Sequence, residues 1–207
     1  KHKIYGVLSQ NPLVSAWCKN HDIPLIDSLQ TFEALAIQKN FDYLFSIVNP
    51  KILSSKILSS SQKLAINYHD APLPRYAGTH ATSWAILNQE KTHGVTWHRM
   101  EPKVDAGDIL KQEIIPIDKG ETALSLNIKC YLIAIKTFKA LCDDLSQGTV
   151  LRVPQDLTKR TFFGTYKKPF SLGFVNWKES GDQIETLFRA LSFGDYPNAL
   201  SSFKILF

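Results

Sequence analysis

Three polar residues of the kinds that move acyl groups stand near the ends of predicted strands. Asn67 and His69 follow the apolar run 64–66, and residues two apart on an extended chain point to the same side. Asp105 lies in the turn-forming segment 104–108 between two predicted strands, where its carboxylate can reach the same pocket. An amide N–H can donate to the oxyanion of a tetrahedral carbonyl, an imidazole moves protons near neutral pH, and a carboxylate can hold that imidazole charged. The three together suit acyl transfer to an amine.

The same residues also allow a purely structural interpretation. An Asn after a strand is often part of an Asx-turn, and Asp-Ala-Gly-Asp is an ordinary hairpin loop. A histidine near a strand end is often a hydrogen-bonded structural residue. No serine or cysteine stands at a recognisable nucleophile position, so the chemical interpretation favours direct attack by the acceptor amine. Both interpretations stay open at this level.

Several other chemistries lack their sequence signatures. The chain has no GxGxxG fingerprint, no GxxxxGK[ST] loop and no GxSxG elbow, which argues against hydride transfer, phosphoryl transfer and α/β-hydrolase chemistry. The histidines between 69 and 98 lack cysteine pairs or an HExxH helix, so no zinc site is predicted.

Strand and helix patterns alternate along most of the chain. Strands are expected at 4–9, 23–26, 43–48, 64–68, 95–99 and 109–117, and helices at 13–21, around 32–36, after Pro50, at 79–90, from 118 to 146 and after Ser180. Asp118 with Glu121, and Ser180 with Gln183, form capping-box patterns. This alternation predicts an α/β fold with a mostly parallel open sheet and helices on both faces, which binds ligands at the carboxyl ends of its strands.

Composition bounds the class of protein. The 207 residues carry a net charge of +5, which favours acidic small molecules, acidic proteins or RNA as partners. No apolar run is long enough to cross a bilayer, and the three cysteines form no CxxC pair, so a reduced, cytoplasmic protein without a membrane partner is expected. The segment 159–178 contains several lysine and arginine residues but no acidic residue. We therefore expect a core domain at 1–152 and a linker with a small C-terminal subdomain at 153–207.

Three sequence blocks carry a family resemblance. Asn67–Gly78 (NYHDAPLPRYAG), His93–Thr96 (HGVT) and Val104–Leu110 (VDAGDIL) resemble, in order and spacing, the 10-formyltetrahydrofolate-dependent formyltransferases. The resemblance covers about residues 1–200. It implies a Rossmann-like catalytic domain that binds no nucleotide cofactor, and transfer of a formyl group from the folate donor to an amine without a metal.

The resemblance also implies roles for single residues. The family's catalytic Asn, His and Asp fall on Asn67, His69 and Asp105. Its pterin-pocket segment falls on 49–53, and its folate-binding loop on 101–105. The implied donor-binding residues are Pro50, Lys51, Ile52, Leu53, Val104 and Asp105.

Two departures from the family pattern stand out. The chain begins at what resembles the family's second strand, so acceptor contacts made by the first strand-turn-helix unit cannot be carried over. The loop after His69 often reads Ser-Leu-Leu-Pro in relatives, whereas 71–74 reads Ala-Pro-Leu-Pro here and lacks that hydroxyl.

The amino-acid sequence of these and neighbouring segments also indicates a branch of the family. Tyr68–Asp70, Ala81–Ile86 and His93–His98 look most like the formylation domains at the start of nonribosomal peptide synthetases, which serve antibiotic biosynthesis. The implied acceptor is the α-amine of an aminoacyl group on a carrier-protein phosphopantetheine arm. The implied partners are a folate cosubstrate and an aminoacyl carrier protein or adjoining adenylation domain, rather than nucleic acid. Sugar N-formyltransferases, methionyl-tRNA formyltransferases, formyltetrahydrofolate hydrolases and a non-catalytic folate- or carrier-binding module remain alternatives.

Smaller candidates have weaker signals. Arg75 and Tyr76 are candidates for substrate contact, and Trp84 and Trp97 for an acceptor channel or the core. His80 and His98 are interpreted as structural residues.

Overall fold

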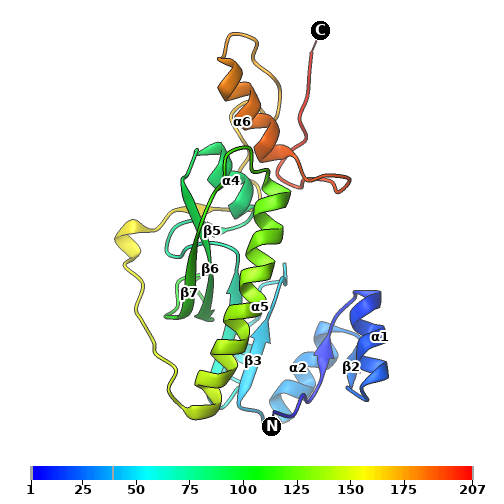
Figure 1. Cartoon of the computed structure of the whole chain (residues 1–207). Helices are drawn as coiled ribbons and strands as arrows, with labels where there is room; N and C mark the ends of the chain where they lie inside the picture. Colours follow the sequence, from blue (N-terminus) through cyan, green and yellow to red (C-terminus); the bar gives the residue numbers. More distant parts are fainter. Residues whose placement is uncertain (1, 39, 207) are drawn as a thin grey trace. The chain divides into compact units, whose positions relative to one another are not determined.

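The protein is described here from a computed structural model that covers residues 2–38 and 40–206 (Figure 1). The chain divides between Ile66 and Asn67 into two compact units. Strand β4 (Leu64–His69) crosses this division, with its last three residues in the second unit.

The first unit begins with a parallel strand pair joined by a helix. β1 (Val7–Leu8) pairs with β2 (Leu25–Ile26), and α1 (Pro12–Asn20) connects them. The Asn11 side chain accepts hydrogen bonds from two backbone N–H groups of the first turn, and proline follows at the first helical position, which explains the helix start. The two strands are shorter than their apolar runs predicted.

The rest of the first unit contains α2 (Leu29–Gln38), β3 (Tyr43–Ser46), α3 (Ser55–Leu58) and the start of β4, which is the sheet neighbour of β3. The helix expected after Pro50 is present, but it does not start at Pro50 itself. The helix starts at Ser55, because the Ser54 hydroxyl accepts a hydrogen bond from the Ile57 N–H and makes Ser54 the N-cap.

The second unit contains the end of β4, β5 (Ala77–Gly78), α4 (Ala81–Leu87), β6 (Thr92–Arg99), β7 (Ile109–Pro116), α5 (Ala123–Gln147), β8 (Phe162–Phe163) and α6 (Gly181–Leu191). In the sheet, β6 lies between β4 and β7. β6 and β7 are an antiparallel pair, whereas β1–β2 and β5–β8 are parallel pairs. Only nine residues connect Arg99 to Ile109, and a parallel pair needs a crossover of about a dozen or more.

Helix α5 covers the β6–β7 hairpin (Figure 1). Trp97 on β6 is buried against it, since its indole N–H donates to the Thr137 hydroxyl at 3.0 Å and its ring lies 5.1 Å from that of Phe138. The N-cap of α5 is Thr122, in a reciprocal capping box with Ser125. The predicted Asp118–Glu121 box is therefore wrong as the helix start, although the Glu121 carboxylate does accept from the Asp118 N–H in the preceding turn.

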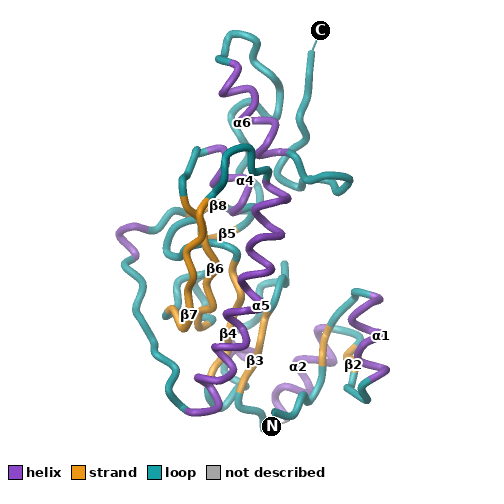
Figure 2. The backbone as a smooth tube through the Cα atoms, viewed as in Figure 1, coloured by secondary structure: helices purple, strands orange, loops and turns teal. Residues whose placement is uncertain are grey.

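The segment after α5 returns to the same unit. Val153 bridges to Ile109, and β8 pairs in parallel with β5 (Figure 2). α6 begins with the predicted Ser180–Gln183 capping box, which is confirmed, and α6 contacts α4. Cys18, Cys130 and Cys142 are free thiols. None of the helices in the described residues is long and apolar enough to span a membrane.

Candidate active site

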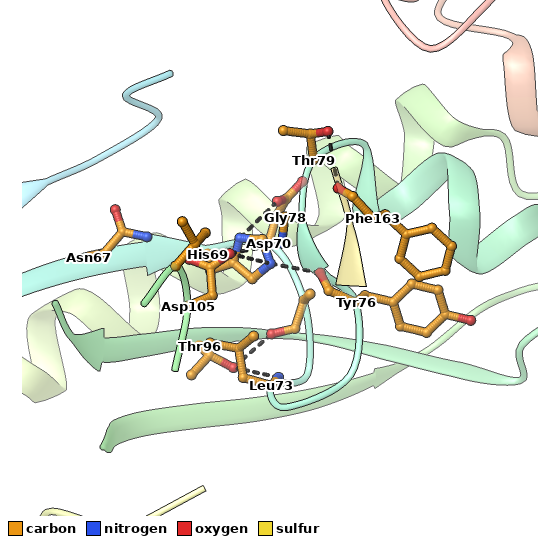
Figure 3. Close-up of polar contacts among 12 residues, drawn as sticks. Asn67, His69, Asp70, Leu73, Tyr76, Gly78, Thr79, Thr96, Asp105 and Phe163 are labelled. Carbon is orange, nitrogen blue, oxygen red and sulfur yellow. Dashed lines mark hydrogen bonds and ion pairs between the residues drawn. The ribbon is translucent and has the colours of Figure 1, made fainter. Parts of the chain in front are cut away.

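His69 ends β4 as a buried residue with a defined tautomer. Its Nε2 lies 2.8 Å from the Tyr76 carbonyl oxygen, and a carbonyl can only accept, so Nε2 carries a proton and donates it (Figure 3). Tyr76 can present this oxygen because its backbone is in the left-handed region at φ 60°. The other nitrogen, Nδ1, lies 3.9 Å from Oδ1 of Asp70, beyond hydrogen-bonding distance.

Asp105 lies in the connection between β6 and β7 and turns its carboxylate toward the end of β4. Its Oδ2 accepts the Gly78 N–H at 2.8 Å and lies 3.8 Å from Nε2 of His69 (Figure 3). Its Oδ1 lies 3.4 Å from Nε2 of His98. The backbone of Asp105 is left-handed at φ 50°, a conformation that aspartate tolerates better than most residues.

The Asp105 carboxylate stays ionised despite its burial. Burial alone would raise the pKa of Asp105. The hydrogen bond to His98, the field of His69 and the Gly78 N–H outweigh it and lower that pKa to about 2. A fixed negative charge therefore stands beside the His69 imidazole at neutral pH.

Asn67 lies two residues before His69 on β4, and its amide is partly buried. Its Nδ2 lies 3.2 Å from Nε2 of His98 on the neighbouring strand β6. Since the same Nε2 faces Asp105, the structure brings Asn67, His69 and Asp105 together and places His98 between two of them. His98 was predicted to be a structural residue, although it belongs to the block 93–98 that carries the family resemblance.

Side chains of β6 and β7 hold the loop that follows His69. The Thr96 hydroxyl donates to the Ala71 carbonyl at 2.7 Å and accepts from the Leu73 N–H at 3.2 Å and from Gln112 at 2.8 Å. Gln112 also donates to the Leu73 carbonyl at 2.9 Å. This support fixes the chain between His69 and its partner Tyr76.

The segment after α5 holds the Asp105 loop from the other side. Gln155 donates to the Asp105 carbonyl at 3.0 Å and to that of Gly107 at 2.6 Å, and Arg160 donates to the Val104 carbonyl at 2.8 Å. A Cβ at Gly107 would collide with the Arg99 carbonyl oxygen, so only glycine fits there. Gln155 and Arg160 were not among the predicted site residues, since no local pattern signals contacts about 50 residues apart.

The predicted donor-binding residues and the smaller candidates lie in different parts of the chain. Pro50, Lys51, Ile52 and Leu53 belong to the first unit, where the Asn49 side chain bonds both the N–H and the carbonyl of Lys51. Val104 is 36% exposed. Arg75 and the Tyr76 hydroxyl both contact the Glu90 carboxylate, and Trp84 and Trp97 are buried.

A partly open cavity of about 250 Å³ lies in the second unit, with Asp70, the residue after His69, in its lining. Asp70, His80, Asn127, Tyr131 and Asn198 supply most of its polar lining. Asn67, His69 and Asp105 do not line it, and Asp70 is the lining residue that also faces the His69 ring. Within the described residues, no group of three or more histidine, cysteine or acidic side chains could hold a metal ion.

Solved structures share this fold over most of the chain. A sugar 3N-formyl transferase, WlaRD, studied in the presence of dTDP and 5-N-formyl-THF, is 22% identical with a TM-score of 0.72, over 90% of this chain and 68% of its own. An N-formyltransferase from Helicobacter canadensis in complex with folinic acid and dTDP-3-aminofucose is 25% identical with a TM-score of 0.72, over 92% and 68%. A 4-N formyltransferase from Francisella tularensis is 20% identical with a TM-score of 0.76, over 93% and 78%. These matches confirm the Rossmann-like α/β fold class.

The family comparison agrees with the fold. The pattern of the family described as "Formyl transferase" matches residues 29–135, just over half of the chain, and this range contains Asn67, His69 and Asp105. The protein therefore belongs to the formyl transferase family and is an enzyme of formyl transfer.

Proposed function

We propose that the protein transfers the formyl group of 10-formyltetrahydrofolate to an amine, with Asn67, His69 and Asp105 as its catalytic residues. The observation that carries this proposal is the convergence of the three side chains at the end of β4. The protonated Nε2 of His69 lies 3.8 Å from the ionised carboxylate of Asp105. The Nε2 of His98 lies between that carboxylate and the amide of Asn67. The folate ligands named for two related structures support the choice of donor.

The reaction requires one bond to form and one to break at the formyl carbon. The neutral acceptor amine attacks that carbon, and the carbonyl oxygen becomes an oxyanion to which an Asn67 N–H donates. The bond to the folate nitrogen then breaks. The amine loses one proton and the folate nitrogen gains one, so the net reaction neither consumes nor releases a proton. His69 supplies the proton to the departing folate nitrogen. The negative charge of Asp105 stabilises the protonated His69 ring, and its carboxylate relays the proton that the amine loses.

The donor-binding residues that the family resemblance implies are Pro50–Leu53 in the first unit and Val104 with Asp105 in the second, and we propose them as binding residues. The part exposure of Val104, and the hydrogen bonds that hold its loop in place, support a binding role for that loop. A cytoplasmic location is proposed with this function, and the three free thiols support it.

The acceptor we propose is the α-amine of an aminoacyl group on a carrier-protein phosphopantetheine arm. The segments Tyr68–Asp70, 81–86 and 93–98 support this choice, because they resemble the formylation domains of nonribosomal peptide synthetases. The net charge of +5 suits an acidic carrier protein.

A nucleotide-linked amino sugar is the second candidate acceptor. It is favoured by the Helicobacter canadensis N-formyltransferase, which is 25% identical to this chain and is bound to dTDP-3-aminofucose. Formylation of an aminoacyl carrier protein, a dTDP-amino sugar and methionyl-tRNA should be compared directly, with 10-formyltetrahydrofolate as donor. We expect the carrier-bound amine to be formylated fastest, and preference for the sugar would replace our choice of acceptor.

Replacing the proposed oxyanion donor tests the catalytic assignment. Asn67→Ala should lower kcat by about 10²–10³-fold, the usual cost of removing one oxyanion donor, while the circular dichroism spectrum stays unchanged. Near-normal turnover by this variant would refute the role of Asn67.

Two further measurements separate the competing classes. Release of formate without acceptor, at the rate of acceptor-driven turnover, would indicate a hydrolase. Folate binding without any formylated product would indicate a non-catalytic module. We expect neither result, because the amide, imidazole and carboxylate stand together in the structure.

A further inference from the structure

Thr161 stands just before β8 and holds the backbone on both sides of Tyr76. Its hydroxyl accepts the Tyr76 N–H at 2.7 Å, and its carbonyl accepts the Ala77 N–H at 3.0 Å. The first bond fixes the peptide plane before Tyr76, and the second fixes the plane after it. Thr161 lies 85 residues from Tyr76 along the chain, so no local sequence pattern signals this contact.

The peptide plane after Tyr76 is held at both of its ends. Its carbonyl oxygen accepts the Nε2 proton of His69 at 2.8 Å, and its N–H, which belongs to Ala77, donates to Thr161 (Figure 3). The carbonyl and the N–H of a trans peptide point in opposite directions, so holding the N–H also aims the oxygen. The left-handed backbone of Tyr76, at φ 60°, is strained for a tyrosine and persists only where its surroundings hold it.

The Nε2 proton of His69 has two oxygens in its neighbourhood. The Tyr76 carbonyl oxygen lies 2.8 Å from Nε2, whereas Oδ2 of Asp105 lies 3.8 Å away, beyond hydrogen-bonding distance. If the Tyr76 backbone relaxed, its carbonyl would turn away, and the ring would be free to turn toward Asp105 or to move its proton to Nδ1. The Tyr76 carbonyl therefore fixes the orientation of the ring and the nitrogen that carries its proton.

We propose that Thr161 is a positioning residue for formyl transfer, which acts on His69 through the backbone of Tyr76. The inference rests on the proposed catalytic role of His69 and adds a residue to it. A ring held in one orientation and one tautomer presents the same nitrogen to the reacting groups in every turnover. A ring that samples several arrangements is ready for proton transfer only part of the time.

The position of Thr161 allows this role to be tested by a small change. Thr161 is an exposed residue, whereas Tyr76 is 2% exposed. Replacing the Thr161 hydroxyl by a methyl group therefore removes little packing but leaves the Tyr76 N–H without its acceptor. The neighbouring Arg160 holds the Val104 carbonyl of the Asp105 loop, and a change confined to the Thr161 side chain leaves that contact in place.

The first test reads the His69 tautomer without any catalysis. In the full chain labelled with ¹⁵N, the ring signals of His69 are identified by their loss in His69→Asn, and their ¹⁵N shifts distinguish a protonated from an unprotonated nitrogen. At a pH where the ring is neutral, we expect the proton on Nε2 in the wild type and a changed or mixed pattern in Thr161→Val. Thr161→Ser keeps the hydroxyl and should keep the wild-type pattern.

Thr158→Val is the matched control for this measurement. Thr158 is also exposed and precedes β8, but its hydroxyl bonds the Asp156 carboxylate two residues away. Its replacement should leave the His69 signals in place. A proton on Nδ1 in the wild type, or unchanged His69 signals in Thr161→Val, would overturn the inference even if the proposed function holds.

The second test is kinetic and uses whichever of the three acceptors is formylated. Thr161→Val should lower kcat about 10-fold with KM for 10-formyltetrahydrofolate changed less than about threefold, and Thr161→Ser should recover most of the loss. The double variant His69→Asn/Thr161→Val should be no slower than His69→Asn alone, because Thr161 acts through His69. Multiplying effects, or a loss in KM alone, would overturn the inference.

The two tests also separate the inference from the function on which it rests. If His69→Asn turns over normally, the proposed function of His69 fails whatever Thr161 does. If His69→Asn is slow while Thr161→Val turns over normally, only the positioning role fails. Should Thr161→Val not fold, Thr161→Ala replaces it in both measurements, and the tautomer of the wild type still tests the inference.

Discussion

Asp105 shows how a buried carboxylate can remain charged where catalysis needs a fixed negative charge. Its two oxygens face different partners, with the Gly78 N–H at 2.8 Å on one and His98 at 3.4 Å on the other. Together with His69 these partners overcome the cost of burial and lower the pKa of Asp105 to about 2. The same interactions that serve the proposed proton relay must therefore also stabilise the folded chain.

This linkage predicts a pH-dependent contribution to stability. The pKa of Asp105 falls from its ordinary value of 3.8 to about 2 on folding, so its contribution is complete above about pH 4 and is lost as pH falls toward 2. The free energy of unfolding of the wild type should exceed that of Asp105→Asn by on the order of 2 kcal/mol more at pH 6 than at pH 2. Urea titrations at both pH values check this, and a pH-independent difference would contradict it.

Strand β6 organises the site because its successive residues serve different neighbours. Trp97 is buried against α5, Thr96 binds the loop after His69, and His98 contacts Asn67 and Asp105. Thr96 is fully buried, and its hydroxyl is the shared partner of Ala71, Leu73 and Gln112. One hydroxyl thus holds the loop that carries the carbonyl partner of His69.

Removing that hydroxyl should affect both stability and catalysis. Thr96→Val keeps the shape of the side chain but leaves buried polar groups unpaired, so we expect a loss of about 1–3 kcal/mol in the free energy of unfolding. We also expect kcat to fall, because the loop between His69 and Tyr76 loosens. Chemical denaturation and steady-state kinetics measure the two effects.

Thr92→Val is the matched control on the same strand, since Thr92 is exposed at its first position. It should change the free energy of unfolding by less than about 0.5 kcal/mol. Equal effects of the two variants would show that the Thr96 contacts contribute nothing to the loop.

At the scale of the molecule, residues 153–207 are built into the second unit. Phe163 stacks between Tyr76, with ring centroids 5.4 Å apart, and Trp84, at 4.6 Å. Its backbone carbonyl accepts the Thr79 N–H at 2.8 Å. Asn198 also donates to the Ser83 hydroxyl on α4 at 3.1 Å. The division into 1–152 and 153–207 stays a prediction, and these contacts cross it.

Phe163 and Phe162 are adjacent in β8 and allow a matched comparison. Phe163 is buried, whereas Phe162 is 47% exposed. Phe163→Ala should lower the free energy of unfolding by about 3–5 kcal/mol, the usual cost of deleting a buried aromatic ring, and Phe162→Ala by much less. Thermal unfolding followed by circular dichroism checks both. A small effect of Phe163→Ala would mean that 153–207 folds apart from the site.

Local patterns in the amino-acid sequence were sufficient for a defined part of this picture. The same-side placement of Asn67 and His69 follows from the two-residue period of a strand, and the start of α6 follows from the Ser180–Gln183 cap. Both depend on residues that are close in sequence. The α/β class follows in the same way from alternating periodicities.

The remaining features were decided by contacts between residues distant in the chain. Asn67 and His98 are 31 residues apart, Gly78 and Asp105 are 27 apart, and Arg160 lies 56 residues from Val104. No local period encodes such pairs, because they depend on which strands become neighbours and in what direction. The short β6–β7 connection makes that pair antiparallel and directs Asp105 back toward β4. Residue types thus indicated the chemistry, whereas the pairing of β4 with β6 placed a second histidine between the amide and the carboxylate.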